Sequence, residues 1–194
     1  MNYLGRILII SGDKNTGKTF LCRKIIRVLK KKKVLVKGVI SLGCYIEEKK
    51  SRIDVEDIFS DEKRTLARFS PGWDAENPIR EWLFDQKNLE WGNELLRKSI
   101  PADVLIIDEL GYLELEKHLG WTNAFNVLGS KRYHLAIIVI RSGLVEKAEK
   151  LWPDSEIIDL NIIQDENQII SKIINVILEF LEIDKQQSPK LHLH

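Results

Sequence analysis

The chain has 194 residues, of which 44% are hydrophobic and 30% are charged, so it is long enough to bury a substantial core as one compact domain. Its 30 Lys and Arg residues are balanced by 29 Asp and Glu residues, and this balance excludes the strongly basic field that is typical of nucleic-acid binders. No apolar stretch approaches the ~20 residues of a transmembrane helix, and the first residues lack the pattern of a secretion signal. We therefore expect a soluble, cytoplasmic protein that binds neither nucleic acid nor a membrane.

The chain opens with a predicted strand, a Gly-rich loop and a helix. Arg6 to Ser11 is a short apolar, β-branched run, and apolar residues recur at helical spacing from Phe20 to Leu29. Between them lies the pattern G-x-x-x-x-G-K-[ST], formed by Gly12, Asp13, Lys14, Asn15, Thr16, Gly17, Lys18 and Thr19. A loop of this kind at a helix N-terminus points backbone N–H groups at a polyphosphate. We therefore predict that these eight residues bind a nucleotide.

Four side chains of the loop carry more specific expectations. Lys18 supplies a cation for the β- and γ-phosphates, and the Thr19 hydroxyl can ligate Mg²⁺. Asn15 stands where the backbone of such loops tends to require a positive φ, and Asn tolerates that conformation better than most residues. Lys14 has two open interpretations, a contact with the phosphates or a solvated loop lysine.

The next segment is predicted to form a strand and an antiparallel hairpin. Residues 34–41 form a strand, and a further extended run at 52–59 follows a charged turn at 47–50. Such short spacing is typical of a hairpin rather than of a βαβ unit, so we place an antiparallel insertion at about 41–69. An aromatic-rich loop is expected at about 70–88, where tryptophans can either contact a nucleobase or pin the loop to the sheet.

The second half of the predicted site follows an apolar run, Val104 to Ile107, which ends in Asp108 and Glu109. A buried parallel strand explains the run, and ligands of open α/β sheets collect at the carboxyl ends of the strands. Asp108 suits Mg²⁺, which keeps several waters and takes few carboxylates. Glu109 is the candidate general base, because it can polarise a water that attacks the γ-phosphate.

The last part of the chain is predicted to alternate helices and strands. A helix around 121–128, a strand at 134–140, a helix at 144–151, a strand at 157–160 and a final apolar-striped helix are expected. Arg141 directly follows the strand at 134–140. It either contacts the γ-phosphate and stabilises charge in the transition state, or forms a surface salt bridge. Residues 185–194 are expected to be a disordered tail, which leaves 1–184 as a single domain.

The order of these motifs resembles the small P-loop nucleoside-triphosphatases described from thermophiles and as a cancer-related enzyme in vertebrates. The resemblance covers nearly the whole chain. Its most distinctive element is D-E-x-G-x-x-E-L, matched by Asp108, Glu109, Gly111, Glu114 and Leu115. It implies a RecA-like sheet with an extra strand between the strands that bear the two motifs, and Mg²⁺-dependent hydrolysis of nucleoside triphosphates with loose base preference. The chain differs from the better-known members at Tyr112, where they carry lysine, and in lacking an arginine within 41–47.

We predict a three-layer α/β/α P-loop NTPase with a RecA-like, mostly parallel sheet and an added antiparallel hairpin. The predicted function is Mg²⁺-dependent hydrolysis of ATP, GTP and related triphosphates to the diphosphate and phosphate, with Glu109, Lys18 and Arg141 in catalysis. One alternative is a nucleotide or small-metabolite kinase, although no arginine-rich run follows the carboxylate strand. The other is a non-catalytic nucleotide switch, for which Glu109 would be dispensable.

Overall fold

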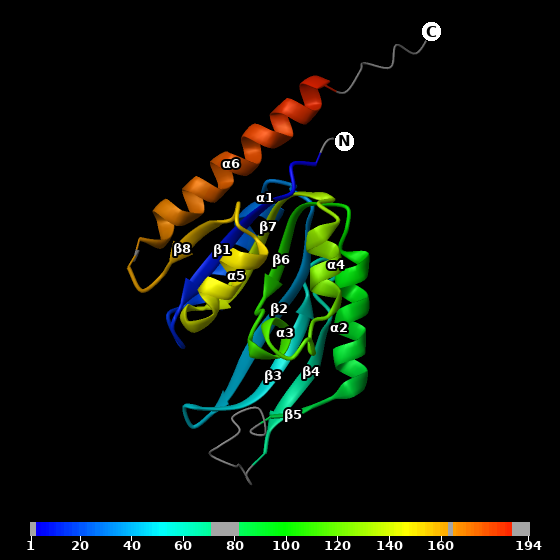
Figure 1. Ribbon diagram of the computed structural model, residues 1–194, viewed down its shortest axis with the longest axis vertical. Helices are drawn as coiled ribbons and strands as arrows, with labels where there is room; N and C mark the ends of the chain where they lie inside the picture. Colours follow the sequence, from blue (N-terminus) through cyan, green and yellow to red (C-terminus); the bar gives the residue numbers. More distant parts are fainter. Residues whose placement is uncertain (1–2, 71–81, 163–164, 188–194) are drawn as a thin grey trace.

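The computed structural model describes residues 3–70, 82–162 and 165–187, and at its centre is an eight-stranded sheet in the order β5-β4-β3-β2-β6-β7-β1-β8 (Figure 1). The neighbouring strands that pair in parallel are β2 (Val36–Ile46), β6 (Ala102–Asp108), β7 (Tyr133–Arg141), β1 (Arg6–Gly12) and β8 (Glu156–Asp159). Beyond β2 the sheet continues with the antiparallel strands β3 (Lys49–Asp57), β4 (Lys63–Phe69) and β5 (Trp82–Phe84). The prediction of a mostly parallel sheet with an added antiparallel part is confirmed.

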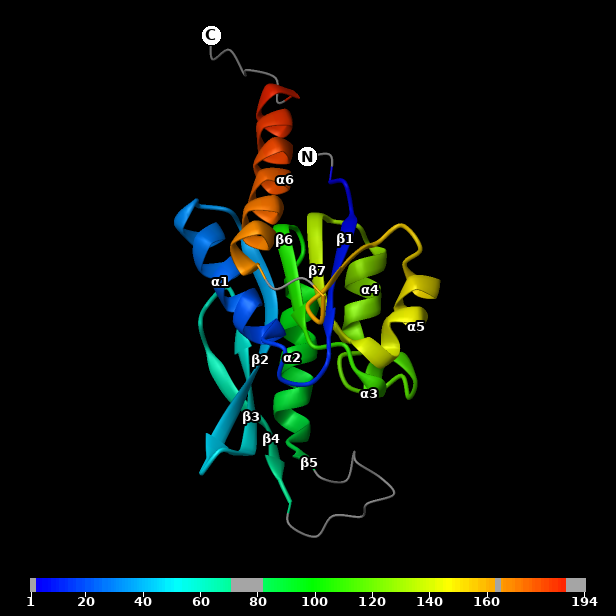
Figure 2. The same ribbon diagram turned by 90° about the vertical axis from the view of Figure 1, so that its left-hand side faces the viewer.

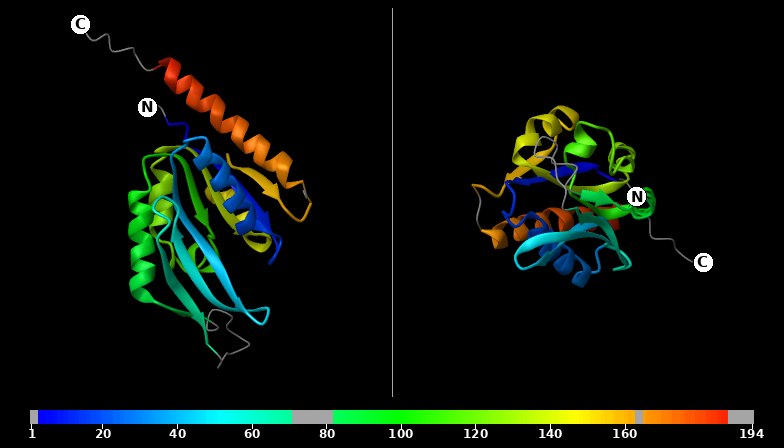
Figure 3. Two further views of the ribbon diagram at one scale, coloured as in Figure 1. Left: turned by 180° about the vertical axis from the view of Figure 1, so that it is seen from behind. Right: turned by 90° about the horizontal axis from the view of Figure 1, so that it is seen from below.

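Helices cover both faces of the sheet, which gives the predicted three layers (Figures 2 and 3). One face carries α1 (Lys18–Lys31) and α6 (Glu166–Gln187). The other face carries α2 (Gln86–Lys98), α3 (Tyr112–Leu115), α4 (Asn123–Gly129) and α5 (Val145–Leu151). A short 3₁₀ turn, η2 (Ser142–Leu144), joins β7 to α5. In the part of the chain that is described, no helix has the length and apolar character needed to cross a membrane.

Each face of the sheet has its own apolar core. Ile10 of β1 is buried with the side chains of α1 and α6, whereas Ile9 is buried with those of α2, α4 and α5. Successive side chains of a strand point to opposite faces, so a strand covered on both sides must be apolar at every position. This requirement explains the unbroken apolar runs at residues 104–107 of β6 and 135–140 of β7.

Strand order brings the two sequence motifs together. β7 lies between β1 and β6 and pairs in parallel with both, as the resemblance implied. Because the strands run the same way, the loop after β1, the carboxylates at the end of β6 and the end of β7 meet at one edge of the sheet. At this edge β2 does not stop level with β6: Ile40 pairs with Asp108, and β2 continues to Ile46 as one arm of a projecting hairpin (Figure 3).

The structure corrects two predicted boundaries. The aromatic-rich loop does not extend to residue 88, because Trp82–Phe84 forms β5 and α2 begins at Gln86, where the Asp85 carboxylate caps the helix by accepting the Asn88 N–H. Residues 71–81, with the predicted aromatic contact of Trp73, lie outside the described residues. The predicted tail begins too early, since α6 continues to Gln187. Residues 188–194 also lie outside the described part.

Candidate functional site

The Gly-rich loop links the end of β1 to the start of α1. Asn15 and Gly17 both have positive φ, at 68° and 89°, so the expectation for Asn15 is confirmed. The Thr16 hydroxyl closes the turn by donating to the Asp13 carbonyl over 2.9 Å. The N-cap of α1 is Gly17, which has no side chain to cap the helix, and the first N–H groups of a helix have no acceptor within it. These donors therefore face the loop, together with the positive end of the helix dipole.

Lys18 lies across the inside of this loop. Its side chain is buried, and its amine donates to the Gly12 carbonyl over 2.7 Å and to the Asp13 carbonyl over 2.5 Å. Burial lowers the pKa of Lys18, while the Glu109 carboxylate opposes that shift. The loop carbonyls therefore hold the Lys18 amine close to the carboxylates at the end of β6. From this position it is predicted to bind phosphate.

Asp108 is buried at the end of β6, beside the start of α1. Its carboxyl group is hydrogen-bonded by the Thr19 hydroxyl and by the Ser41 backbone, yet its Oδ2 atom is buried without a partner among the described residues. Burial raises the pKa of Asp108 to about 7, with the Thr19 hydrogen bond opposing the shift and Glu109 adding to it. An unpartnered carboxylate oxygen next to a threonine hydroxyl fits a hard cation such as Mg²⁺.

Glu109 and Arg141 form an ion pair at the same edge. The Arg141 Nε atom lies 2.6 Å from Glu109 Oε1, and the two side chains are 57% and 27% exposed. Arg141 is the last residue of β7, so the structure places it where the sequence predicted. Its partner, however, is the proposed general base, and its contact with phosphate stays a prediction.

Asn161 ties the Gly-rich loop to the far end of the chain. Its side-chain oxygen accepts the Asp13 N–H over 3.1 Å, and its amide donates to the Ser142 hydroxyl over 3.1 Å. Sequence reasoning missed this residue, because nothing local relates Asn161 to a loop 148 positions away. Lys14 in the same loop is exposed, which leaves both of its interpretations open.

Glu114 organises the segment after the carboxylate pair. One carboxylate oxygen accepts the Gly111 N–H over 2.8 Å, and the other accepts the Trp121 N–H over 2.9 Å. The side chain is buried, and burial raises its pKa. Glu114 thus has a structural role in the D-E-x-G-x-x-E-L pattern. Its two hydrogen bonds fix the turn that follows Glu109.

Replacing Glu114 with alanine is expected to lower the free energy of unfolding by about 2 kcal/mol or more, because two N–H groups lose their acceptor in a buried site. Urea unfolding followed by circular dichroism measures the change. Glu90→Ala, at an exposed position of α2, is the control and should stay within about 0.5 kcal/mol of the unmodified protein. Equal stability of the two variants would contradict the role given to Glu114.

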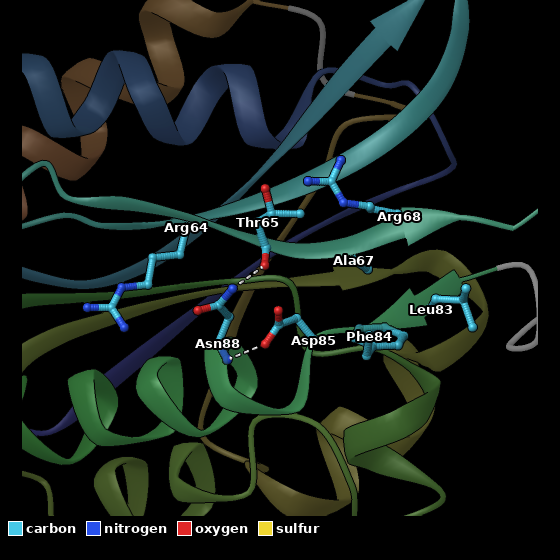
Figure 4. A pocket seen from close by; sticks show the side chains of 8 residues that line it. All are labelled: Arg64, Thr65, Ala67, Arg68, Leu83, Phe84, Asp85 and Asn88. Carbon is cyan, nitrogen blue, oxygen red and sulfur yellow. Dashed lines mark hydrogen bonds between the residues drawn. The ribbon is translucent and has the colours of Figure 1, made fainter.

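A separate hollow of ≈ 580 Å³ lies between β4, β5 and the start of α2 (Figure 4). Its lining includes Arg64, Arg68, Leu83, Phe84, Asp85 and Asn88. Arg64 is already paired with Glu62 and stacked on Trp91, at 4.3 Å from the ring centroid. β3 and β2 separate β4 from β6. The hollow therefore takes no part in the site at the ends of β1, β6 and β7.

The fold and this edge define a P-loop nucleotide-binding protein of the α/β class. The site combines a buried loop lysine and a threonine after β1 with a buried aspartate and a glutamate at the end of β6. β1 and β6 run parallel, with β7 between them. The chain belongs to the NTPase family, whose sequence model matches residues 7–174. No curated protein sequence matches the chain.

Two solved structures have the same fold. One is the solution structure of a human cancer-related nucleoside triphosphatase, with a TM-score of 0.66 and 22% identity over 88% of this chain and 96% of that one. The other is the crystal structure of THEP1 from the hyperthermophile Aquifex aeolicus, with a TM-score of 0.62 and 19% identity over 88% of this chain and 98% of that one. The match over nearly the full length of both agrees with the architecture predicted from the sequence.

Proposed function

We propose that this protein hydrolyses nucleoside 5'-triphosphates such as ATP and GTP to the diphosphate and phosphate, with Mg²⁺ as its cofactor. The observation that carries the proposal is the meeting of Lys18, Asp108 and Glu109 at one edge of the sheet. Each group has a separate chemical task there, in anion binding, cation binding and activation of water. Membership of the NTPase family and the likeness to the fold of a human nucleoside triphosphatase support it.

Thr19 and Asp108 are the residues proposed to hold Mg²⁺. The unpartnered Asp108 Oδ2 atom supports this assignment, because burial of a carboxylate oxygen is costly without a compensating partner. Mg²⁺ usually keeps several waters and takes one or two protein carboxylates together with phosphate oxygens, so a site with few protein ligands suits it. When bound, Mg²⁺ neutralises charge on the β- and γ-phosphates.

The remaining chemistry comes from the side chains around it. The loop N–H groups and Lys18 bind the phosphate oxygens and fix the γ-phosphate at the edge of the sheet. Glu109 accepts a hydrogen bond from a water and orients that water for attack on the phosphorus atom. Arg141 holds the Glu109 carboxylate through its Nε atom, and the rest of its guanidinium can donate to the charge that spreads over the transferred phosphoryl group.

Phosphate release from ATP, GTP, CTP and UTP, with Mg²⁺ and with excess EDTA, tests the proposal. We expect release from several triphosphates in the presence of Mg²⁺ and its loss in EDTA. Release only after addition of a hydroxyl acceptor, with phosphate transferred to that acceptor, would support a kinase instead. Tight binding without release under any condition would support a nucleotide switch.

Arg141→Ala is expected to lower kcat by more than it raises KM, because the interaction of Arg141 with Glu109 and the reacting phosphate should be strongest in the transition state. Steady-state kinetics on the folded fraction measures both constants. Arg132→Ala is a control of equal charge, since Arg132 is an exposed residue at the opposite end of β7. Wild-type kcat in Arg141→Ala, with only reduced thermal stability, would remove Arg141 from the site.

A further inference from the structure

The hairpin of β2 and β3 brings a lysine to the candidate site that the sequence places in a solvated turn. β2 passes Asp108 at Ile40, and β3 returns with Lys50 opposite Tyr45. The pairing between the two strands shifts at Cys44 and Tyr45, and a bulge of this kind re-aims the side chains that follow it. Lys50 therefore belongs to β3, and the charged turn is shorter than predicted.

The Lys50 side chain reaches back along β2 towards the site. Its Cε atom lies against Gly43, where an added Cβ would come within 2.8 Å of it and within 3.1 Å of the Tyr45 ring. Its amine lies 5.6 Å from the centroid of the Trp82 ring, and the residue is half-buried. Gly43 thus leaves the space that the lysine stem occupies, and Trp82 borders its charged end.

Lys50 also shares its electrostatic surroundings with Lys18. Burial lowers the pKa of Lys50, the carboxylates of Glu109 and Asp108 oppose the shift, and the cations Arg141 and Lys14 add to it. The same two carboxylates and Arg141 act on Lys18. Within residues 3–70, 82–162 and 165–187, no carboxylate lies within ion-pair distance of the Lys50 amine, whereas Arg141 is paired with Glu109. As far as the described residues go, Lys50 is therefore a cation that is available to a bound anion.

We propose that Lys50 binds the terminal phosphate of the nucleoside triphosphate from the hairpin, as a second cation beside Lys18 of the loop. This inference rests on the proposed function. Phosphates that lie against the loop N–H groups and Lys18 leave the terminal group turned towards Glu109. The Lys50 ammonium group contacts only this terminal phosphate. It therefore raises the affinity for triphosphates above that for diphosphates, and it orients the phosphoryl group that is transferred.

Calorimetric binding of a non-hydrolysable ATP analogue and of ADP tests this assignment without requiring turnover. Lys50→Met is expected to weaken binding of the analogue about 10-fold or more, the scale of one charge-assisted contact, and to leave ADP binding within about two-fold. Lys49→Met is the matched control, because Lys49 is the adjacent, exposed lysine of the same strand, and it should bind both ligands as the unmodified protein does. Lys50→Arg should recover most of the lost affinity.

Gly43→Ala gives a second, independent variant that keeps every charge. The added methyl group occupies the space of the Lys50 stem and should displace the amine, so it is expected to reproduce part of the loss seen in Lys50→Met. In the kinetic assay, Lys50→Met should lower kcat/KM for ATP by about 10-fold or more, with Lys49→Met unchanged.

If Lys50→Met binds the analogue and ADP as tightly as Lys49→Met does, the role of Lys50 is overturned. This holds even if the unmodified protein hydrolyses ATP as proposed. Conversely, suppose that Lys50→Met binds the analogue more weakly while the unmodified protein releases no phosphate. That pair of results would support the Lys50 site and contradict hydrolysis. Equal loss of analogue and ADP binding would also overturn the assignment to the terminal phosphate. Failure of the unmodified protein to bind either ligand would overturn both proposals.

Discussion

Lys18→Ala is expected to abolish tight triphosphate binding and turnover together. The Lys18 amine is buried inside the phosphate loop, where a cation paired with a phosphate oxygen is screened less than at the surface. Its removal should weaken nucleotide binding by about 100-fold or more, which corresponds to losing a contact of about 3 kcal/mol between charged groups. Calorimetry with ATP and Mg²⁺ measures the change, and phosphate release measures the turnover.

The fold should survive this substitution, because the hydrogen-bond partners of Lys18 belong to its own loop rather than to the two apolar cores. Circular dichroism provides the check. Lys31→Ala, at the exposed end of the same helix, is the charge-matched control and should bind ATP normally. Unchanged affinity in a correctly folded Lys18→Ala variant would refute the assignment of Lys18.

Glu109→Gln is expected to retain binding of Mg²⁺ and nucleotide while losing roughly 10²-fold or more in kcat, the scale of positioned general-base catalysis. Glutamine has nearly the same shape, and its side-chain oxygen can still accept the hydrogen bond from Arg141 Nε. The variant therefore changes the charge and basicity of the group with little change in its position. Single-turnover phosphate release and calorimetry separate the chemical step from binding.

Glu116→Gln is a suitable control, because Glu116 lies after α3 and pairs with Lys147 on the surface. Its kcat should match that of the unmodified protein. Equal turnover in Glu109→Gln would mean that water is not activated by this carboxylate, and a kinase or a nucleotide switch would then explain the site better.

The core of the site is predictable from the sequence because its parts follow continuous patterns. The loop is a single run from Gly12 to Thr19, and Asp108 ends an unbroken apolar run. In a parallel sheet the carboxyl ends of neighbouring strands share an edge, so both motifs and Arg141 are brought together by topology alone. The positive φ of Asn15 is predictable for a similar reason, because it depends on local sterics.

The residues that the sequence does not reveal depend on tertiary register. Lys50 has the same local surroundings in sequence as Lys49, and only the pairing shift at Cys44 and Tyr45 turns it towards the site. Asn161 reaches Asp13 because β8 pairs with β1. No periodicity or composition distinguishes either residue from an ordinary solvated side chain.

The position of β1 has a consequence for the order in which the molecule is completed. β1 has β7 on one side and β8 on the other, with Ile10 paired to Val139 and to Ile158. A ribosome makes the phosphate loop long before either neighbour, so β1 has no adjacent strand until most of the chain has been synthesised. Such distant pairings form slowly, because a long segment must close first. The phosphate loop is therefore completed late in folding, after β7 and β8 have paired with β1. Nucleotide binding would then indicate that these strands are in place.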